Sequence, residues 1–390
     1  MGNEKAKLST VLITGGCGFV GTNVVEYLSQ RGYAVRILDN LSTSAMGWTT
    51  ESPPPTEVSP QSESSATSHE PSAEPLNRQT AKPTRQTPNL LVGDIRDKEA
   101  VAKAVDGVDA VVHLAAHTSV VESVENPEED WDINVNGTLN LLEACRRRGV
   151  EKFILASSNA VAGEQEPPID ETKVPQPLSP YGASKLAAEG LCSAYYHSFG
   201  LKTVALRFAN VYGPHSEHKS SVITKFMKKA RKGEPLVIYG DGNQTRDFVH
   251  VDDICQAIHL VLTADSRQST VDSSQSESSA IRLRRISHQQ TQQTQGTQGI
   301  PLPWGEVFQI ASGVETTINE LVKLILETAN NSKTANSQLS TIYEPERPGE
   351  IKRNYSDISK ARTVLGFEPV MNLERELSSI WESYNRSTDD

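Results

Sequence analysis

Apolar positions in the first part of the chain follow two alternating patterns. A β-branched run at residues 8–13 is followed by a stretch whose apolar side chains recur on one helical face, as at Val24, Val25 and Leu28. The first pattern is typical of a buried strand and the second of an amphipathic helix. A second apolar run then ends at Asp39. These residues together predict a strand–helix–strand unit.

The same alternation continues to about residue 156. Strand-like runs are expected at 90–92, 110–114 and 153–156, with helical stretches at 98–105 and 131–147 between them. Strands that alternate with helices predict a parallel sheet covered on both faces. The predicted fold class is therefore α/β, a Rossmann-type doubly wound parallel sheet.

The parallel pattern breaks down after residue 214. A helical stretch at 222–232, a short strand at 236–239 and a helix from Asp252 follow instead. We therefore expect a Rossmann domain at 8–204 and a smaller α/β domain, for substrate, at 205–386.

Two stretches do not fit either pattern. Residues 44–88 are rich in Ser, Thr, Pro and Glu, and residues 265–300 in Ser, Gln and Thr. Such compositions cannot bury enough apolar surface to offset the entropy lost on ordering. We expect both to be disordered insertions. Passive insertion is favoured, and a docking or phosphorylation role is the alternative.

Composition narrows the class of protein further. A net charge of -11 argues against nucleic acid as a partner. The start of the chain has no apolar stretch of spanning length and no leader pattern, so we expect no membrane association and a cytoplasmic location. Four scattered cysteines lack metal-ligand spacing, which predicts reduced thiols and no metal site. Their positions are Cys17, Cys145, Cys192 and Cys255.

A glycine cluster lies between the first predicted strand and helix. Gly15, Gly18 and Gly21 form GxxGxxG, which lets the backbone approach a pyrophosphate at the helix N-terminus. Asp39, at the end of the next strand, can accept hydrogen bonds from an adenosine ribose and would repel a 2′-phosphate. The predicted cofactor is NAD rather than NADP. The alternative is an Asp39 that only caps a turn.

Tyr181 and Lys185 are spaced i and i+4 on a predicted helix that starts after Pro180. Their side chains should emerge on one face. A neighbouring ammonium and an oxidised nicotinamide would both favour the tyrosine phenolate. Ser157 and Ser158 end a predicted strand, where a hydroxyl could bind a sugar oxygen or the tyrosine.

Two arginines in the second half suit a diphosphate. Arg246 follows a glycine-rich turn and Arg347 lies in a Pro-Gly loop. The alternative is that they pair with the adjacent Asp247 and Glu350. Three histidines lack ligand spacing and are expected to pack or to lie beside the cofactor: His113, His117 and His250.

These motifs resemble those of the extended short-chain dehydrogenase/reductases, specifically the NAD-dependent epimerase/dehydratase family, which contains the UDP-glucose 4-epimerases. The matching stretches are TGGCGFVG, LDN, GDIRD, HLAAHTS, NVNGT, SPYGASK, RFANVYGP, GDGNQTRDFVHVDD and ERPGE. The resemblance implies a catalytic set of Ser158, Tyr181 and Lys185. It implies NAD contacts at Gly15, Gly16, Gly18, Phe19, Val20, Gly21, Asp39, Asn40, Asp94, Ile95, Leu114, Ala115, Ala116, Asn134 and Lys185. It implies nucleotide-sugar contacts at Ser158, Tyr181, Asn210, Arg246 and Arg347.

The activity implied is interconversion of UDP-hexoses at C4 through a 4-keto intermediate, in a homodimer paired through helices 131–147 and 181–199. Ser158 is followed by Asn159 and Ala160, so the carboxylate typical of dehydratases and decarboxylases is missing. A net nucleotide-sugar oxidoreductase and a non-catalytic NAD-binding protein remain as rivals. Ala162 and Ala209 replace larger aromatic residues of the family, which leaves the sugar open among glucose, N-acetylglucosamine and glucuronate.

Overall fold

The computed structural model describes residues 9–43, 88–265, 302–331, 339–346 and 351–386. The predicted insertions at 44–88 and 265–300 lie outside the described residues except at their edges, Pro88 and Asp265. Asp265 belongs to the folded part, because it accepts hydrogen bonds from Lys202 (2.9 Å) and from the indole of Trp304 (3.1 Å).

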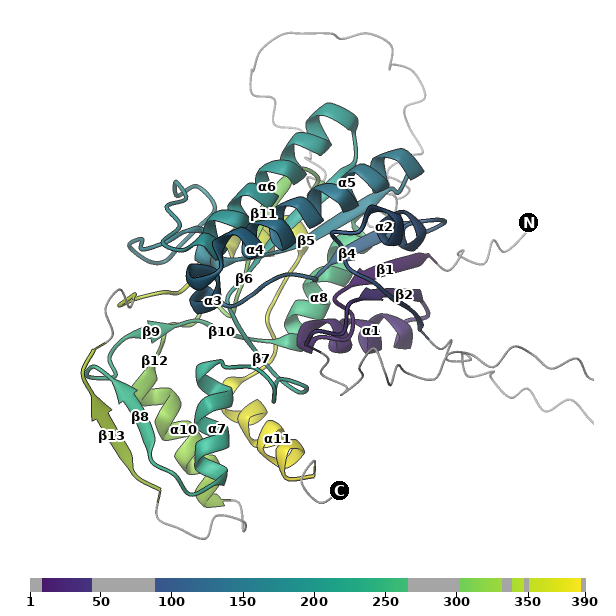
Figure 1. The fold of residues 1–390 in the computed structure, drawn as a ribbon. Coiled ribbons are helices and arrows are strands. Elements are labelled where there is room, and N and C mark those ends of the chain that lie inside the picture. The colour runs from purple at the N-terminus through teal and green to yellow at the C-terminus, as the bar shows by residue number, and fades with distance from the viewer. Residues whose placement is uncertain (1–8, 44–87, 266–301, 332–338, 347–350, 387–390) are drawn as a thin grey trace, which may run out of the picture.

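One parallel sheet forms the centre of the molecule (Figure 1). Its seven strands are, in spatial order, β11 (Glu306–Ile310), β6 (Lys202–Phe208), β5 (Lys152–Ser158), β4 (Ala110–His113), β1 (Thr10–Thr14), β2 (Ala34–Asp39) and β3 (Asn89–Val92). This sheet confirms the predicted fold class. Strand β6 crosses the predicted domain boundary after residue 204, and β11 brings a strand from the second half into the same sheet.

Helices cover both faces of the sheet. Val11 and Ile13 of β1 pack in one apolar core with α1 (Phe19–Gln30) and α8 (Val251–Leu262). Leu12, which points to the opposite face, packs in a second core with the helices on that side. These are α2 (Lys98–Ala104), α5 (Gly137–Arg148) and α6 (Pro180–Phe199).

The helix predicted at 131–147 is longer and interrupted. It begins as α4 (Pro127–Trp131), with Pro127 at the first position, where a missing N–H costs nothing. A π-helical turn (Asp132–Asn136) then leads into α5. This turn sets Asn134 against Asp130, whose Oδ1 accepts a hydrogen bond from the Asn134 Nδ2 (3.1 Å). A short helix, α3 (Val120–Glu125), precedes α4.

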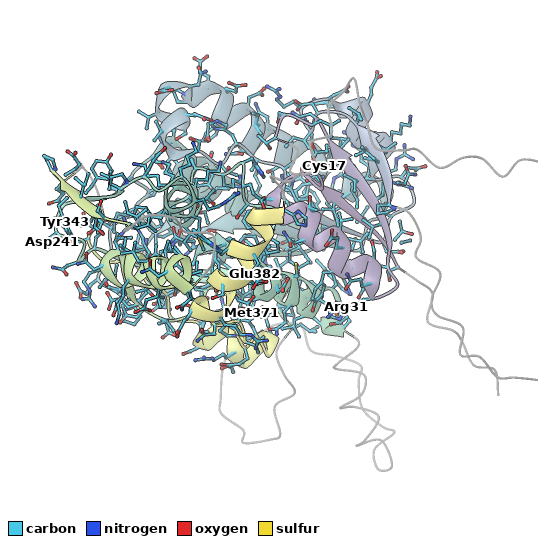
Figure 2. All side chains as sticks on the ribbon, turned by 90° about the horizontal axis from the view of Figure 1, so that it is seen from below. Cys17, Arg31, Asp241, Tyr343, Met371 and Glu382 are labelled. Atoms are coloured by element: carbon cyan, nitrogen blue, oxygen red, sulfur yellow. The ribbon has the colours of Figure 1, made fainter. Side chains whose placement is uncertain are left out.

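The smaller part of the molecule lies below the sheet in Figure 1. It contains three two-stranded ladders: β7 (Asn210–Tyr212) with β10 (Phe248–His250), β9 (Thr245–Arg246) with β12 (Thr316–Thr317), and β8 (Leu236–Tyr239) with β13 (Thr341–Glu344). Its own apolar core joins α7 (Val222–Arg231), α10 (Ile318–Asn331) and α11 (Leu373–Arg386). Figure 2 shows Asp241 and Tyr343 at the outer edge of this part, far from Cys17.

All four cysteines are buried and free. Within the described ranges, no helix has both the length and the apolar character needed to cross a membrane.

Candidate active site

The glycine turn joins β1 to α1 at the carboxyl edge of the sheet. Gly15 has a φ of 70°, and a Cβ there would come within 2.7 Å of the Ala115 backbone nitrogen. A Cβ on Gly21 would collide with the Gly15 carbonyl. Both positions therefore require glycine, and the turn packs against the loop that follows β4.

The N-terminus of α1 is suited to an anion. Its N-cap is Gly18, which offers no side-chain acceptor to the first amides of the helix. By contrast, α2 and α6 are capped by the side chains of Asp97 and Ser179. Amides at a helix start bind phosphate oxygens well. The described residues of this turn thus fit the pyrophosphate of a dinucleotide, with Phe19 and Val20 in the first turn.

Asp39 lies at the end of β2 and is 8% exposed. Its carboxylate accepts hydrogen bonds from the backbone of Cys17 (2.9 Å) and Leu41 (2.7 Å). Burial raises the pKa of Asp39, and these two hydrogen bonds oppose that shift. The Asp39 side chain therefore stabilises the glycine turn, which is the role that the alternative interpretation gave it. Each carboxylate oxygen has a second lone pair, so a ribose contact stays a prediction.

Asn40 and Asp94 lie together on the far side of this turn. The Asn40 amide donates to Asp94 (3.3 Å). Arg96, which the sequence argument did not select, donates to both Asp94 oxygens at 3.0 and 2.8 Å. This pairing lowers the pKa of Asp94 to about 2. Ile95 is buried beneath them and lies close to Gly137.

The loop after β4 carries Leu114, Ala115 and Ala116. Asn134 holds this loop, because its amide oxygen accepts from the His117 nitrogen (2.9 Å) and its Nδ2 donates to the His117 carbonyl (3.0 Å). Asn134 is 2% exposed. Its position is that of a support for the cofactor loop, and direct contact with NAD stays a prediction.

Ser158, Tyr181 and Lys185 meet where β5 ends against the first turns of α6. The side chain of Ser158 lies close enough to Tyr181 to lower the pKa of its hydroxyl. The Lys185 ammonium donates to the Ala156 carbonyl (3.0 Å), and the lysine is 4% exposed. The Tyr181 nitrogen donates to Ser123 of α3 (3.2 Å), which fixes the start of α6. The structure therefore brings the predicted set together.

Burial governs the ionisation of this set. It lowers the pKa of Lys185 to about 8, against the charges of Asp130 and Glu189, which raise it. Burial and the charge of Asp130 raise the pKa of Tyr181, and the side chain of Ser158 lowers it. Desolvation thus dominates the Tyr181 pKa in the protein, whereas the sequence predicted that Lys185 would lower it. A phenolate would need further positive charge nearby, such as an oxidised nicotinamide.

The histidines near this edge are structural. The two ring nitrogens of His113 are hydrogen-bonded to the hydroxyls of Thr14 (2.7 Å) and Thr138 (2.9 Å). Burial lowers its pKa to about 3. His250 accepts a hydrogen bond from the Asp252 nitrogen and caps α8. In the part of the chain that the structure describes, no group of three or more His, Cys, Asp or Glu side chains could hold a metal ion.

On the predicted substrate side, Asn210 lies two residues after Phe208, the partner of Ser158 in the β5–β6 register. Arg246 donates through Nη1 to the carbonyls of Thr245 (2.7 Å) and Ile351 (2.8 Å). The alternative pairing of Arg246 with Asp247 does not form. The Asp247 carboxylate instead accepts hydrogen bonds from the loop at 312–313. Arg347 and Glu350 lie outside the described residues.

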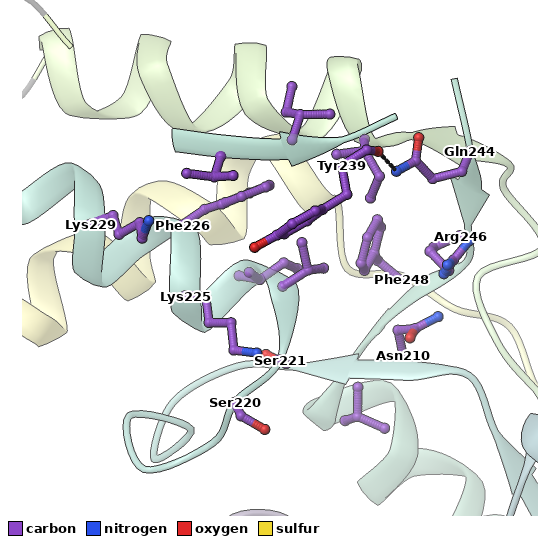
Figure 3. A pocket seen from close by; sticks show the side chains of 16 residues that line it. Asn210, Ser220, Ser221, Lys225, Phe226, Lys229, Tyr239, Gln244, Arg246 and Phe248 are labelled. Carbon is purple, nitrogen blue, oxygen red and sulfur yellow. Dashed lines mark hydrogen bonds between the residues drawn. The ribbon is translucent and has the colours of Figure 1, made fainter. Parts of the chain in front are cut away.

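A cavity of about 430 Å³ opens beside Asn210 and Arg246 (Figure 3). Three aromatic side chains line it: Phe226, Tyr239 and Phe248. Lys225 and Lys229 of α7 add positive charge that the sequence argument missed. The sequence signal that could have identified these two lysines is their i, i+4 spacing, which places them on one face of a helix. Aromatic walls with nearby cations suit a nucleotide base and its phosphates.

The described residues thus define a Rossmann-type protein with a dinucleotide site and a Ser–Tyr–Lys set. The family model for the NAD dependent epimerase/dehydratase family matches residues 11–272, and the chain belongs to that family. NAD is accordingly its cofactor, and the glycine turn and uncapped α1 fit it.

Comparison with individual proteins gives the same family. A relative from Methanocaldococcus jannaschii named putative UDP-glucose 4-epimerase is 33% identical over 386 residues, covering 97% of this chain and 100% of the relative. A dTDP-glucose 4,6-dehydratase of Xanthomonas campestris pv. campestris is 29% identical over 95% of this chain and 92% of the relative. The crystal structure of UDP-glucose 4-epimerase with UDP-glucose from Thermotoga maritima has a TM-score of 0.71 at 30% identity, over 97% of this chain and 99% of that chain.

Proposed function

We propose that the chain is an NAD-dependent 4-epimerase of UDP-hexoses that works through a 4-keto intermediate. The observation that carries this proposal is the meeting of Ser158, at the end of β5, with Tyr181 and Lys185, which lie one helical turn apart at the start of α6. The nearby cavity, lined by aromatic and basic side chains, would hold the nucleotide.

The residues have separate roles in this mechanism. Tyr181 Oη removes the proton from the sugar 4-hydroxyl and later returns it, while Ser158 binds the same sugar oxygen. Lys185 supplies positive charge beside the tyrosine and would hold the nicotinamide ribose. NAD, when bound, supplies reversible hydride acceptance at C4. Arg246, the basic residues of α7 and Arg347 would hold the diphosphate while the sugar rotates.

The region after Ser158 favours epimerisation over dehydration. Asn159 and Ala160 occupy the short 3-10 helix that follows β5, and the Asn159 amide donates to Asn354 (3.3 Å). Elimination of water from the sugar needs an acid or base beyond the tyrosine. Neither residue provides one at this position.

The proposal is tested with a substrate panel. Purified protein is incubated with UDP-glucose, UDP-N-acetylglucosamine or UDP-glucuronate, and the products are identified by NMR. We expect the 4-epimer of at least one sugar, without accumulation of free NADH. A 4-keto-6-deoxy product would instead identify a dehydratase, and stoichiometric NADH a net oxidoreductase. Failure of all three sugars to react would overturn the proposal.

A further inference from the structure

Asp130 is a fully buried carboxylate that the mechanism above does not use. It lies in α4 and is 0% exposed. Its Oδ2 accepts a hydrogen bond from the Ser184 hydroxyl (2.6 Å), and its Oδ1 one from Asn134 (3.1 Å). The Nδ1 of His117 is 3.1 Å from the same Oδ1. A carboxylate this deep in a fold is rare unless its partners are built around it.

The partner that matters most is Ser184. It directly precedes Lys185 in α6, and its hydroxyl lies 3.0 Å from the Tyr181 carbonyl. Asn134 also donates to this hydroxyl (3.0 Å). Asp130 is therefore tied, through one side chain, to the helical turn that runs from Tyr181 to Lys185. A displacement of this turn would move both catalytic side chains.

The charges around Asp130 are few. From its own side, His117 bridges it to the exposed Glu122, with the His117 Nε2 3.0 Å from Glu122. From α6, Tyr181 and Lys185 are the side chains whose pKa values the charge of Asp130 raises. Glu189 is a second carboxylate near Lys185, but it already pairs with Arg207 at 2.8 Å. Asp130 has no arginine among these partners, and its charge raises the pKa of Lys185 through space.

We propose that Asp130 is a positioning residue, which holds the Tyr181–Lys185 turn through Ser184 and keeps a negative charge near the Lys185 ammonium. This inference rests on the proposed function for its catalytic consequence. Its electrostatic part concerns Lys185 alone and is measurable without substrate.

The first test is Asp130→Asn, which keeps the shape and removes the charge. We expect kcat to fall about tenfold or more, since small misplacements of reacting groups have effects of this size. The KM for the sugar nucleotide and the bound NAD should change little. The loss of activity at alkaline pH should begin at lower pH, because Lys185 loses the carboxylate that raises its pKa. Glu128→Gln, an exposed carboxylate on the same helix, is the matched control and should behave as wild type.

The second test measures Lys185 directly. Side-chain NMR of nitrogen-labelled lysine, with Lys185 assigned from its absence in Lys185→Met, gives the pKa of this amine. We expect a lower value in the Asp130→Asn protein than in wild type. An unchanged Lys185 titration would refute the charge role, whatever happens to kcat. If the wild-type protein epimerises no sugar, the proposed function fails, yet this titration still decides the inference.

Ser184→Ala removes the hydrogen bond to Asp130 but keeps the carboxylate charge. It therefore also tests the positioning role if the Asp130→Asn protein does not fold. We expect a lower kcat with an unshifted alkaline limit, because the carboxylate remains. Wild-type kcat in the Ser184→Ala protein would overturn the positioning role.

Discussion

Tyr181 is the residue on which the proposed chemistry depends most. We predict that Tyr181→Phe lowers kcat by at least about 100-fold, because the ring still packs but the proton acceptor is lost. The purified variant should still contain bound NAD, and its melting temperature should stay within a few degrees of the wild-type value. Tyr195→Phe, on the same helix with its hydroxyl on Glu143, is the control and should retain activity. Near-wild-type turnover by Tyr181→Phe would exclude the tyrosine as the base.

Asp39 stabilises the glycine turn in the structure, and we predict that it also binds the adenosine ribose. Asp39→Ala should reduce the melting temperature, since the Cys17 and Leu41 amides lose their acceptor. It should also weaken NAD binding and narrow the preference for NAD over NADP, because the charge that repels a 2′-phosphate is gone. Titration with both dinucleotides checks the second effect. An unchanged preference would show that Asp39 only braces the turn.

The residues that sequence reasoning found and missed differ in a physical way. The glycines, Tyr181 and Lys185 occur in motifs whose spacing reflects local geometry. Asp130 carries no such pattern, because the sequence of a helix gives no sign that a charged residue on it is buried. Only the tertiary packing of α4 against α6 buries Asp130, and no local signal reports that contact.

Helix α6 carries the proposed catalytic pair, and we expect activity to depend on its N-cap. The Ser179 hydroxyl accepts a hydrogen bond from the Gly182 nitrogen (3.1 Å). We predict that Ser179→Ala destabilises the protein by about 1 kcal/mol in urea unfolding. It should also lower kcat, because the cap lies two residues before Tyr181. Ser198→Ala, at the exposed end of α6, is the control. An equal effect of both substitutions would argue against a special role for this cap.

The main strands and helices were predictable for a definite reason. A parallel sheet is buried on both faces, so its strands form short continuous apolar runs that alternate with amphipathic helices. β3, β4 and β5 accordingly lie where they were expected. The π turn before α5 was not predictable, because it follows from the inward packing of Asn134 rather than from apolar spacing.

At the scale of the whole molecule, several apolar side chains remain uncovered on the helices of one face. Val121 and Val124 of α3 are 69% and 64% exposed, and Phe199 of α6 is 55% exposed. Exposed apolar side chains such as these favour association when a second copy covers them. We predict a homodimer through this face, with α5 and α6 at its centre. Sedimentation should give the mass of two chains, and only monomer at micromolar concentration would contradict the prediction.

The central claim is that hydride leaves C4 of the sugar and returns to C4. The most direct measurement uses UDP-glucose, or whichever sugar reacts, labelled with deuterium at C4. If hydride returns to C4, the epimeric product will carry the deuterium at C4. Deuterium recovered at C6, or in free reduced NAD, would contradict it and identify a dehydratase or a net oxidoreductase instead.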